Sequence, residues 1–326
     1  MKVKQKILVI RFSSIGDIVL TTPVVRCLKQ QLPETTVHYV TKEVFAPVLN
    51  ANPYVDKLFT FKKDISEIYE ELQREKYDQV IDLHKNLRSL RLKQKLNTDS
   101  HSFEKLNVQK FLAVKLKMIS ALPTQHIVER YMATVKSLGV KSDAKGLDYF
   151  LEEKDRINVG GLFFNGKETK YIALVVGGSY YTKKIPLNKL RDVCIGASLP
   201  VVLLGGKEDL VIAGELQKEF PSLINACGKF TINQSASLVQ QAEWVITSDT
   251  GLMHIASAFN KKIISVWGNT IPEFGMAPYL PNNENKILEI KNLSCRPCSK
   301  LGYSKCPKGH FKCMDEIDFS FVQDLK

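Results

Sequence analysis

Residues 244–259 read WVITSDTGLMHIASAF. The opening residues Trp244 to Thr247 are apolar or β-branched and predict a buried strand. The polar run Ser248-Asp249-Thr250-Gly251 follows, and the apolar stretch Leu252 to Phe259 then predicts a helix. A strand that gives way to a helix through a short polar loop is the repeating unit of parallel α/β sheets.

The second half of the chain repeats this unit. Further strands are predicted at Tyr171 to Val176, Val201 to Leu204, Leu223 to Ala226 and Ile263 to Trp267, with helical segments between them. This alternation predicts a parallel sheet with right-handed crossovers. Ligands of such sheets bind beyond the carboxyl ends of the strands, so we expect the chemistry in the loops that follow them.

The first half predicts a second α/β region. Its expected strands are Lys6 to Phe12, Val37 to Thr41, Lys57 to Phe61 and Gln79 to Leu83, with an amphipathic helix over residues 65–72. Pro23 interrupts a helical stretch at residues 17–32, so that helix either kinks there or starts afresh with Thr22 as its cap. Residues 87–139 are predicted to be helical and basic, with Gly139 as a helix end, and residues 141–167 to form a weak strand and the interdomain connection.

Length and composition indicate two folded domains. The chain has 326 residues, which suits two domains of ordinary size, and we place them at residues 1–158 and 159–326. The apolar run Ile7 to Ile10 is too short for a signal-peptide core, and no stretch approaches the roughly 18 apolar residues of a membrane span, so a cytoplasmic location is expected.

The net charge of the sequence is +12. This excess of positive charge favours nucleic acid, anionic lipid or phosphorylated sugar as a partner, or it belongs to an ordinary solvated basic surface.

Three loops after strands could hold an anion. At residues 248–251 a helix N-terminus offers backbone N–H groups, Thr250 a hydroxyl and Gly251 close backbone approach, with His254 one turn further on. The alternative is a capped helix, with Asp249 or Thr250 as the cap and His254 as a surface or core histidine.

The other two loops are Gly177-Gly178-Ser179, which is followed by Lys183 and Lys184, and residues 205–209, which contain Glu208 and Asp209. The lysines could neutralise the charge of a diphosphate, and the carboxylates could accept hydrogen bonds from ribose hydroxyls. Turn chemistry and the helix dipole explain the same residues equally well. No GxGxxG or GxxxxGK[ST] motif occurs here, which argues against a dehydrogenase or a P-loop ATPase.

Two further candidates carry chemistry. Asp17 follows Gly16 just after the first predicted strand and could act as a general base, or simply stabilise a helix N-terminus. The cysteines at 295, 298, 306 and 313, with His310, could supply four ligands to a structural zinc ion, or remain free thiols under a C-terminal loop. The sequence leaves the metal question open.

Two long motifs resemble a known family. Residues 10–17, IRFSSIGD, with Thr22-Pro23, and residues 248–256, SDTGLMHIA, with Gly268-Asn269-Thr270, are similar to the bacterial ADP-heptose:lipopolysaccharide heptosyltransferases. Asn269 departs from that family's pattern, in which Gly-Pro-Thr is common. The resemblance implies an α/β GT-B architecture of two Rossmann-like domains with parallel sheets facing across a cleft, the first binding the acceptor and the second the nucleotide sugar.

The resemblance also implies a reaction. It is the inverting transfer of heptose from ADP-heptose to a lipopolysaccharide inner-core acceptor, with Asp17 as the catalytic base and no cofactor required. The expected donor contacts are Ser179, Lys183, Glu208, Asp249, Thr250, Gly251 and His254. The expected acceptor contacts are Ser14, Gly16, Arg88, Arg91 and Arg130.

The implied partners are the nucleotide sugar and a lipid-linked core oligosaccharide, reached by peripheral association with the inner face of the cytoplasmic membrane, and not nucleic acid. Two alternatives stay open. One is a GT-B transferase that uses another nucleotide sugar for a different surface glycan. The other is a non-catalytic protein that binds nucleotide sugars.

Overall fold

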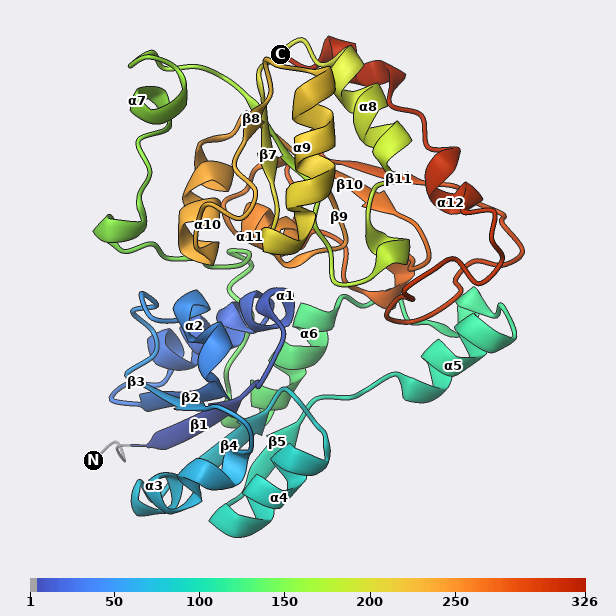
Figure 1. Cartoon of the computed structure of the whole chain (residues 1–326). Coiled ribbons are helices and arrows are strands. Elements are labelled where there is room, and N and C mark those ends of the chain that lie inside the picture. The colour runs from blue at the N-terminus through green and yellow to red at the C-terminus, as the bar shows by residue number, and fades with distance from the viewer. Residues whose placement is uncertain (1–4) are drawn as a thin grey trace. The chain divides into compact units, whose positions relative to one another are not determined.

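The computed structural model describes residues 5–326, which form two compact units (Figure 1). Unit 1 comprises the chain up to Lys105 together with Gln125–Phe150. Unit 2 comprises Leu106–Thr124 and Leu151–Lys326. The division after Phe150 lies earlier than the expected boundary after residue 158. The sequence also gave no indication that residues 106–124 belong to the second unit.

Unit 1 is built on a parallel five-stranded sheet of order β3-β2-β1-β4-β5. Its strands are β1 (Lys6–Ile10), β2 (Thr36–Lys42), β3 (Lys57–Phe61), β4 (Gln79–Asp82) and β5 (Ser100–Ser102). The four predicted strands are confirmed. The short edge strand β5 lies in a stretch that was predicted to be entirely helical.

The α-helices of unit 1 are α1 (Ile15–Val19), α2 (Thr22–Gln31), α3 (Tyr69–Arg74), α4 (Leu87–Leu96) and α6 (Ile127–Met132). Its 3-10 helices are η1 (Glu43–Val48), η2 (Ile65–Ile68) and η4 (Ala133–Leu138). The helix interrupted by Pro23 does start afresh, with Thr21 rather than Thr22 at the cap position, because proline is tolerated only in a first turn. Gly139 ends η4 with φ 78°, as predicted.

Unit 2 is built on a parallel six-stranded sheet of order β11-β10-β9-β6-β7-β8. Its strands are β6 (Ile172–Val175), β7 (Val201–Leu204), β8 (Ile224–Asn225), β9 (Trp244–Ser248), β10 (Lys262–Trp267) and β11 (Lys286–Glu289). All five predicted strands are present, and the exposed edge strand β11 is additional. The prediction of two parallel α/β domains is therefore confirmed.

The α-helices of unit 2 are α5 (Asn107–Lys115), α7 (Val159–Phe163), α8 (Leu187–Gly196), α9 (Leu210–Glu219), α10 (Ile232–Gln241), α11 (Gly251–Ala258) and α12 (Lys312–Asp315). Its 3-10 helices are η3 (Ile119–Ala121), η5 (Glu153–Asp155), η6 (Tyr181–Lys183), η7 (Lys207–Asp209), η8 (Pro272–Phe274) and η9 (Ser320–Asp324). The weak strand predicted within residues 141–167 is wrong. That stretch is irregular apart from η5 and α7, and its glycines and asparagines favour turns over strands.

Each face of the unit 2 sheet has its own apolar core. Ile246 and Ile264 point to the core that also holds Met314 near the C-terminus, whereas Val245 and Ile263 point to the opposite core. Successive residues alternate between faces because a strand repeats every two residues. A sheet covered on both faces leaves its strand ends, where the loops emerge, as the place for a polar site.

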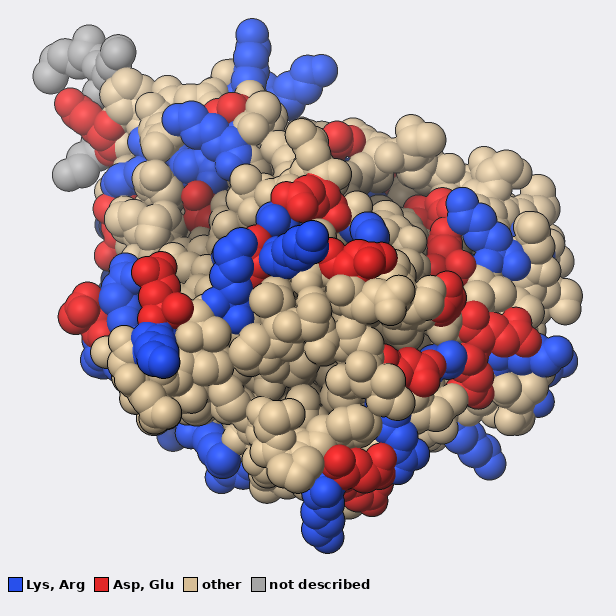
Figure 2. Space-filling view, turned by 90° about the horizontal axis from the view of Figure 1, so that it is seen from above, with Lys and Arg blue, Asp and Glu red and all other residues tan. Residues whose placement is uncertain are grey.

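Positive and negative side chains are interspersed on the face seen in Figure 2, where Lys and Arg lie beside Asp and Glu. The excess positive charge of the sequence is therefore not gathered into one field on that face. Within residues 5–326, no helix is both long and apolar enough to cross a membrane.

Candidate functional site

Four loops of unit 2 leave the carboxyl ends of neighbouring strands. β10, β9, β6 and β7 are adjacent in the sheet, and the loops that follow them cover residues 268–270, 248–251, 177–184 and 205–209. Parallel strands place these loops along one edge. Three of these four loops were predicted from their position after a strand. The loop at residues 268–270 was singled out only because it resembles the family motif.

Asp249 is the hub of the polar contacts at this edge. The Lys183 Nζ atom lies 2.6 Å from Asp249 Oδ2, and both side chains are largely buried. The Thr270 hydroxyl donates to the same oxygen at 3.4 Å. The carboxylate thus connects η6 with the loops that follow β9 and β10, and it fixes the position of the lysine ammonium group.

The N-terminus of α11 lies next to this hub. Thr250 is the N-cap, and its Oγ1 accepts a hydrogen bond from the Met253 N–H at 3.4 Å. This contact decides the cap in favour of Thr250 and leaves Asp249 to hold Lys183. Gly251 begins the helix, where backbone N–H groups lack helical partners and favour an anion. His254 is buried rather than on the surface.

Ser179 and Glu208 line one pocket of about 720 Å³ together with Lys184 and Tyr303. Asp209 does not take part, because it accepts from the Gly206 N–H at 2.9 Å and pairs with Lys184 Nζ at 2.6 Å. Asp209 therefore holds the loop in shape, and Glu208 is the carboxylate that the loop presents to the pocket.

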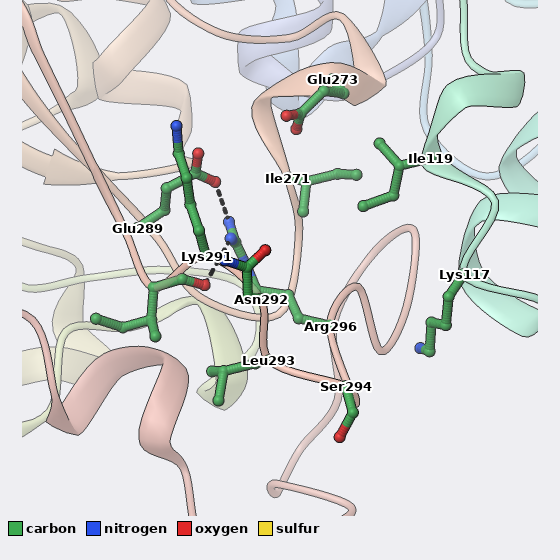
Figure 3. A pocket seen from close by; sticks show the side chains of 11 residues that line it. Lys117, Ile119, Ile271, Glu273, Glu289, Lys291, Asn292, Leu293, Ser294 and Arg296 are labelled. Atoms are coloured by element: carbon green, nitrogen blue, oxygen red, sulfur yellow. Dashed lines mark hydrogen bonds and ion pairs between the residues drawn. The ribbon is translucent and has the colours of Figure 1, made fainter.

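Arg296, which the sequence did not single out, fixes the loop that carries Thr270. Its buried guanidinium donates to the carbonyl of Gly268 at 2.6 Å and to that of Thr270 at 3.0 Å. The same group pairs with Glu289 at 2.7 Å and donates to the Ile290 carbonyl, contacts drawn as dashed lines in Figure 3. Arg296 thereby joins the C-terminal part of the chain to the loop that bonds Asp249.

The family resemblance implies a site for the ADP part of the donor at this edge of the sheet, so we predict that Arg296→Lys weakens ADP binding about tenfold. A lysine can satisfy one of the two loop carbonyls but not both, and a lost hydrogen bond to a charged group costs about 1.5–3 kcal/mol. Calorimetric titration with ADP measures the change. The matched control is Arg191→Lys, because Arg191 pairs with Glu219 on the exposed surface. An unchanged ADP affinity for Arg296→Lys would show that the loop does not depend on this arginine.

Asn269 lies in the middle of the same loop. Its side chain is buried, and neither amide atom has a hydrogen-bond partner within residues 5–326. A buried amide without a partner is costly, and such groups are rare unless a ligand or water completes them. The residue at which this chain departs from the family pattern thus has free hydrogen-bonding capacity.

Asp17 lies in unit 1, in the short helix α1. Ser14 caps that helix, and its Oγ donates to Asp17 Oδ2 at 2.8 Å. Asp17 Oδ1 pairs with the Arg11 guanidinium at 2.7 Å. Gly16 is buried in the same turn. An arginine partner favours the ionised carboxylate, which is the form that can accept a proton.

Arg11 belongs to the recognised motif but was given no role of its own. Three acceptors besides Asp17 hold its guanidinium, namely the carbonyls of Ser13 and Leu83 and the Tyr131 hydroxyl. Burial opposes its charge, but Asp17 and the nearby tyrosines outweigh that effect, so the pKa of Arg11 is raised. Arg11 is therefore a fixed cation that orients the Asp17 carboxylate.

The three arginines expected to contact the acceptor lie in different surroundings. Arg88 stands over the Phe12 ring at 5.7 Å, whereas Arg91 is exposed. Arg130 is 4% exposed, and its Nε and one terminal nitrogen have no hydrogen-bond partner in the described part of the chain. Burial lowers the pKa of Arg130, and an anionic ligand would compensate its charge.

His84 follows β4, and its ring lies 4.8 Å from the Phe12 ring. Burial, followed by the neighbouring charge of Arg11, lowers the pKa of His84 from 6.5 to about 3. The folded protein therefore keeps this imidazole neutral at pH values where the unfolded chain is protonated. As a neutral ring it can accept a hydrogen bond.

We predict that this histidine makes the protein less stable in acid. Between pH 6.5 and about 3 the unfolded chain binds a proton that the folded chain does not, so the free energy of unfolding falls as the pH falls through this window. Between pH 7 and pH 4, the free energy of unfolding should fall by roughly 1–2 kcal/mol less in the His84→Gln variant than in the wild type. Urea unfolding at both pH values measures this, with His101→Gln as the control. Identical losses in wild type and His84→Gln would contradict the prediction.

The cysteine segment brings Cys295 and His310 close together. Across residues 5–326, no group of three or more His, Cys, Asp or Glu side chains is placed to hold a metal ion. Cys295 Sγ is 3.8 Å from His310 Nε2, and the Cys298 thiol donates to the Cys295 carbonyl. Burial raises the pKa of Cys298 to about 11 and that of Cys313 to about 12.

Solved structures with the same arrangement of strands and helices identify the fold. A glycosyl transferase of family 9 from Veillonella parvula superposes with a TM-score of 0.79 at 22% identity, covering 100% of this chain and 97% of that one. The Escherichia coli ADP-heptose lipopolysaccharide heptosyltransferase II gives a TM-score of 0.70 at 17% identity, with 95% and 98% covered. The two parallel α/β units thus have the fold of these proteins, the GT-B fold.

The particular family follows from the sequence match. The chain belongs to glycosyltransferase family 9 (heptosyltransferase), whose model matches residues 65–305. Lipopolysaccharide heptosyltransferase 1 of Campylobacter coli is 25% identical over 316 residues, 87% of this chain and 89% of that protein. Lipopolysaccharide heptosyltransferase 3 of E. coli is 24% identical, with 78% and 81% covered. The resemblance drawn from the two motifs is confirmed.

Proposed function

We propose that the protein transfers heptose from ADP-heptose to a lipopolysaccharide inner-core acceptor, with inversion at the anomeric carbon. The main support for donor binding is the Lys183–Asp249 pair beside the N-terminus of α11. A lysine and helix N–H groups together match the charge of a diphosphate. Solved structures of the E. coli heptosyltransferase WaaC contain ADP and an ADP-heptose analogue, which supports the same donor here.

Donor recognition is assigned to unit 2. Lys183, Thr250 and Gly251 meet the diphosphate, and Asp249 orients the lysine. Glu208 accepts hydrogen bonds from the ribose hydroxyls, while Ser179 and His254 contact the diphosphate or the sugar. The pocket shared by Ser179 and Glu208 supports this division, because it brings a small hydroxyl residue and a free carboxylate to one cavity.

Catalysis is assigned to unit 1. The ionised Asp17 carboxylate takes the proton from an acceptor hydroxyl as that oxygen bonds to C1 of the heptose. The bond between C1 and the diphosphate oxygen breaks, and ADP leaves. Lys183 and the α11 N–H groups stabilise the negative charge that develops on the leaving group, so the scheme requires no metal ion.

The acceptor is assigned to the remaining polar groups of unit 1, which are Ser14, Gly16, Arg88, Arg91 and Arg130. Arg130 has the strongest support, because a buried guanidinium with unfilled N–H groups suits a phosphate or carboxylate. An acceptor with a lipid anchor lies in a membrane, so the proposal includes peripheral association with the inner face of the cytoplasmic membrane.

Nucleotide selectivity tests the donor assignment. We expect calorimetric titration to give tighter binding for ADP than for UDP or GDP. Tighter binding of UDP or GDP would favour the alternative transferase that uses another nucleotide sugar.

A further inference from the structure

The segment Leu106–Thr124 is fastened to unit 2 along one side. Ala113 and Leu122 are buried in a small apolar cluster with Ile271 and Phe274. The Lys117 ammonium group donates to the carbonyls of Cys295 and Pro297 at 3.0 and 2.8 Å. Figure 3 shows Lys117 and Ile119 on one side of a pocket of about 610 Å³, opposite residues 289–296. The segment is therefore held in place rather than loosely attached.

The opposite side of this segment is apolar and exposed. The exposed fractions are 68% for Val108, 59% for Phe111, 60% for Leu116 and 47% for Met118. Val108, Phe111 and the exposed Lys115 follow one another at spacings of three and four, so they form one stripe along α5. A helix that is apolar on two sides normally has both sides covered.

The charge of the segment is of one sign. Residues 106–124 contain Lys110, Lys115 and Lys117 and no aspartate or glutamate. The exposed Val211 lies in different surroundings, because its helix α9 also carries Glu215 and Glu219. Exposed apolar side chains beside lysines, in a segment that has no carboxylate of its own, complement a surface that is both anionic and able to take up apolar groups. The headgroup region of an acidic phospholipid bilayer is such a surface.

We propose that the surface formed by Val108, Phe111, Lys115, Leu116 and Met118, here termed the α5 surface, docks on the anionic face of a phospholipid bilayer. Phe111 and Leu116 enter the boundary between headgroups and acyl chains, and Lys115 meets lipid phosphates. A second copy of the chain is a poorer partner, because a symmetric contact between two α5 surfaces would bring lysines together with no carboxylate between them.

The inference deepens the proposed function, since it rests on a lipid-linked acceptor and names the part of the protein that meets the lipid. Vesicle binding is measured without donor or acceptor. A transferase without vesicle binding would overturn this inference alone. A protein that binds vesicles but transfers no sugar would overturn the proposed function alone.

Vesicle flotation of the full chain provides the test. We expect the protein to float with vesicles of phosphatidylglycerol and phosphatidylcholine but not with phosphatidylcholine alone. The Phe111→Ser/Leu116→Ser variant should lose at least about tenfold in bound fraction, and Lys115→Glu should also weaken binding. Both variants change exposed side chains, so their thermal midpoints should match the wild type. The control is Ile195→Ser/Val211→Ser, which removes two apolar residues of 73% and 75% exposure elsewhere in unit 2.

Three results would overturn the proposal. The first is wild-type protein that does not float with the acidic vesicles. The second is equal flotation of the wild type and the Phe111→Ser/Leu116→Ser variant. The third is a concentration-dependent dimer that this variant abolishes, which would assign the α5 surface to contact between copies of the chain.

Discussion

Replacement of Asp17 by Asn should lower kcat by about three orders of magnitude while leaving ADP affinity unchanged, because general-base catalysis contributes roughly 10²–10⁴ to a rate. The amide has nearly the shape of the carboxylate and can still accept from the Ser14 hydroxyl, which lies 2.8 Å away. Arg11 keeps its bonds to the Ser13 and Leu83 carbonyls and to Tyr131, so the local fold should persist. The variant loses the proton acceptor and the ion pair of Asp17 with Arg11, in which the charged atoms lie 2.7 Å apart.

Steady-state transfer kinetics and ADP titration of the same preparation measure this result. The matched control is Asp56→Asn, since Asp56 also pairs with a cation of unit 1, Lys29 at 2.7 Å, on a more exposed surface. The control should keep wild-type turnover. Wild-type turnover in Asp17→Asn would remove Asp17 from the role of base.

Replacement of Lys183 by Ala should weaken ADP binding by about two orders of magnitude and adenosine binding by much less. The ammonium group is assigned to the diphosphate, which adenosine lacks, and a charge-assisted bond of this kind is worth about 1.5–3 kcal/mol. Part of the loss will come from Asp249, whose largely buried carboxylate would lose its partner 2.6 Å away and repel the phosphates.

The double variant Lys183→Ala/Asp249→Asn separates these contributions. If the lysine binds phosphate directly, the double variant should recover only part of the lost ADP affinity. The control Lys189→Ala removes a lysine that pairs with Asp192 within α8. Equal losses of ADP and adenosine affinity in Lys183→Ala would exclude a phosphate role.

The fold was predictable where strands are buried on both sides. β6, β7 and β9 consist of fully buried residues, so their apolar and β-branched runs stand out in the sequence. The sequence of β5 is Ser-His-Ser, and that of the exposed edge strand β11 is Lys-Ile-Leu-Glu. Neither strand contains an apolar run long enough to be recognised in the sequence. The inclusion of residues 106–124 in unit 2 depends on contacts with residues far along the chain, which no local pattern encodes.

The candidate site was predictable where it follows strands. Asp17 and the 248–251 loop were found because a polar residue between a strand and a helix lies at the ligand-binding edge of a parallel sheet. Arg11 and Arg296 were not assigned roles. Each pairs with a nearby carboxylate but is also held by a distant backbone carbonyl, 72 positions away for Arg11 and 28 for Arg296. Any residue type can offer a carbonyl, so the sequence gives no sign of such a partner.

A transfer assay with purified protein tests the central claim most directly. ADP-heptose and rival UDP- and GDP-sugars are offered with lipid-linked acceptors from defined core truncations, and the product is identified by mass and anomeric configuration. We predict that one truncated acceptor gains a single heptose from ADP-heptose, with inverted configuration and release of one ADP. Transfer from a different nucleotide sugar only, or a product with retained configuration, would contradict the account.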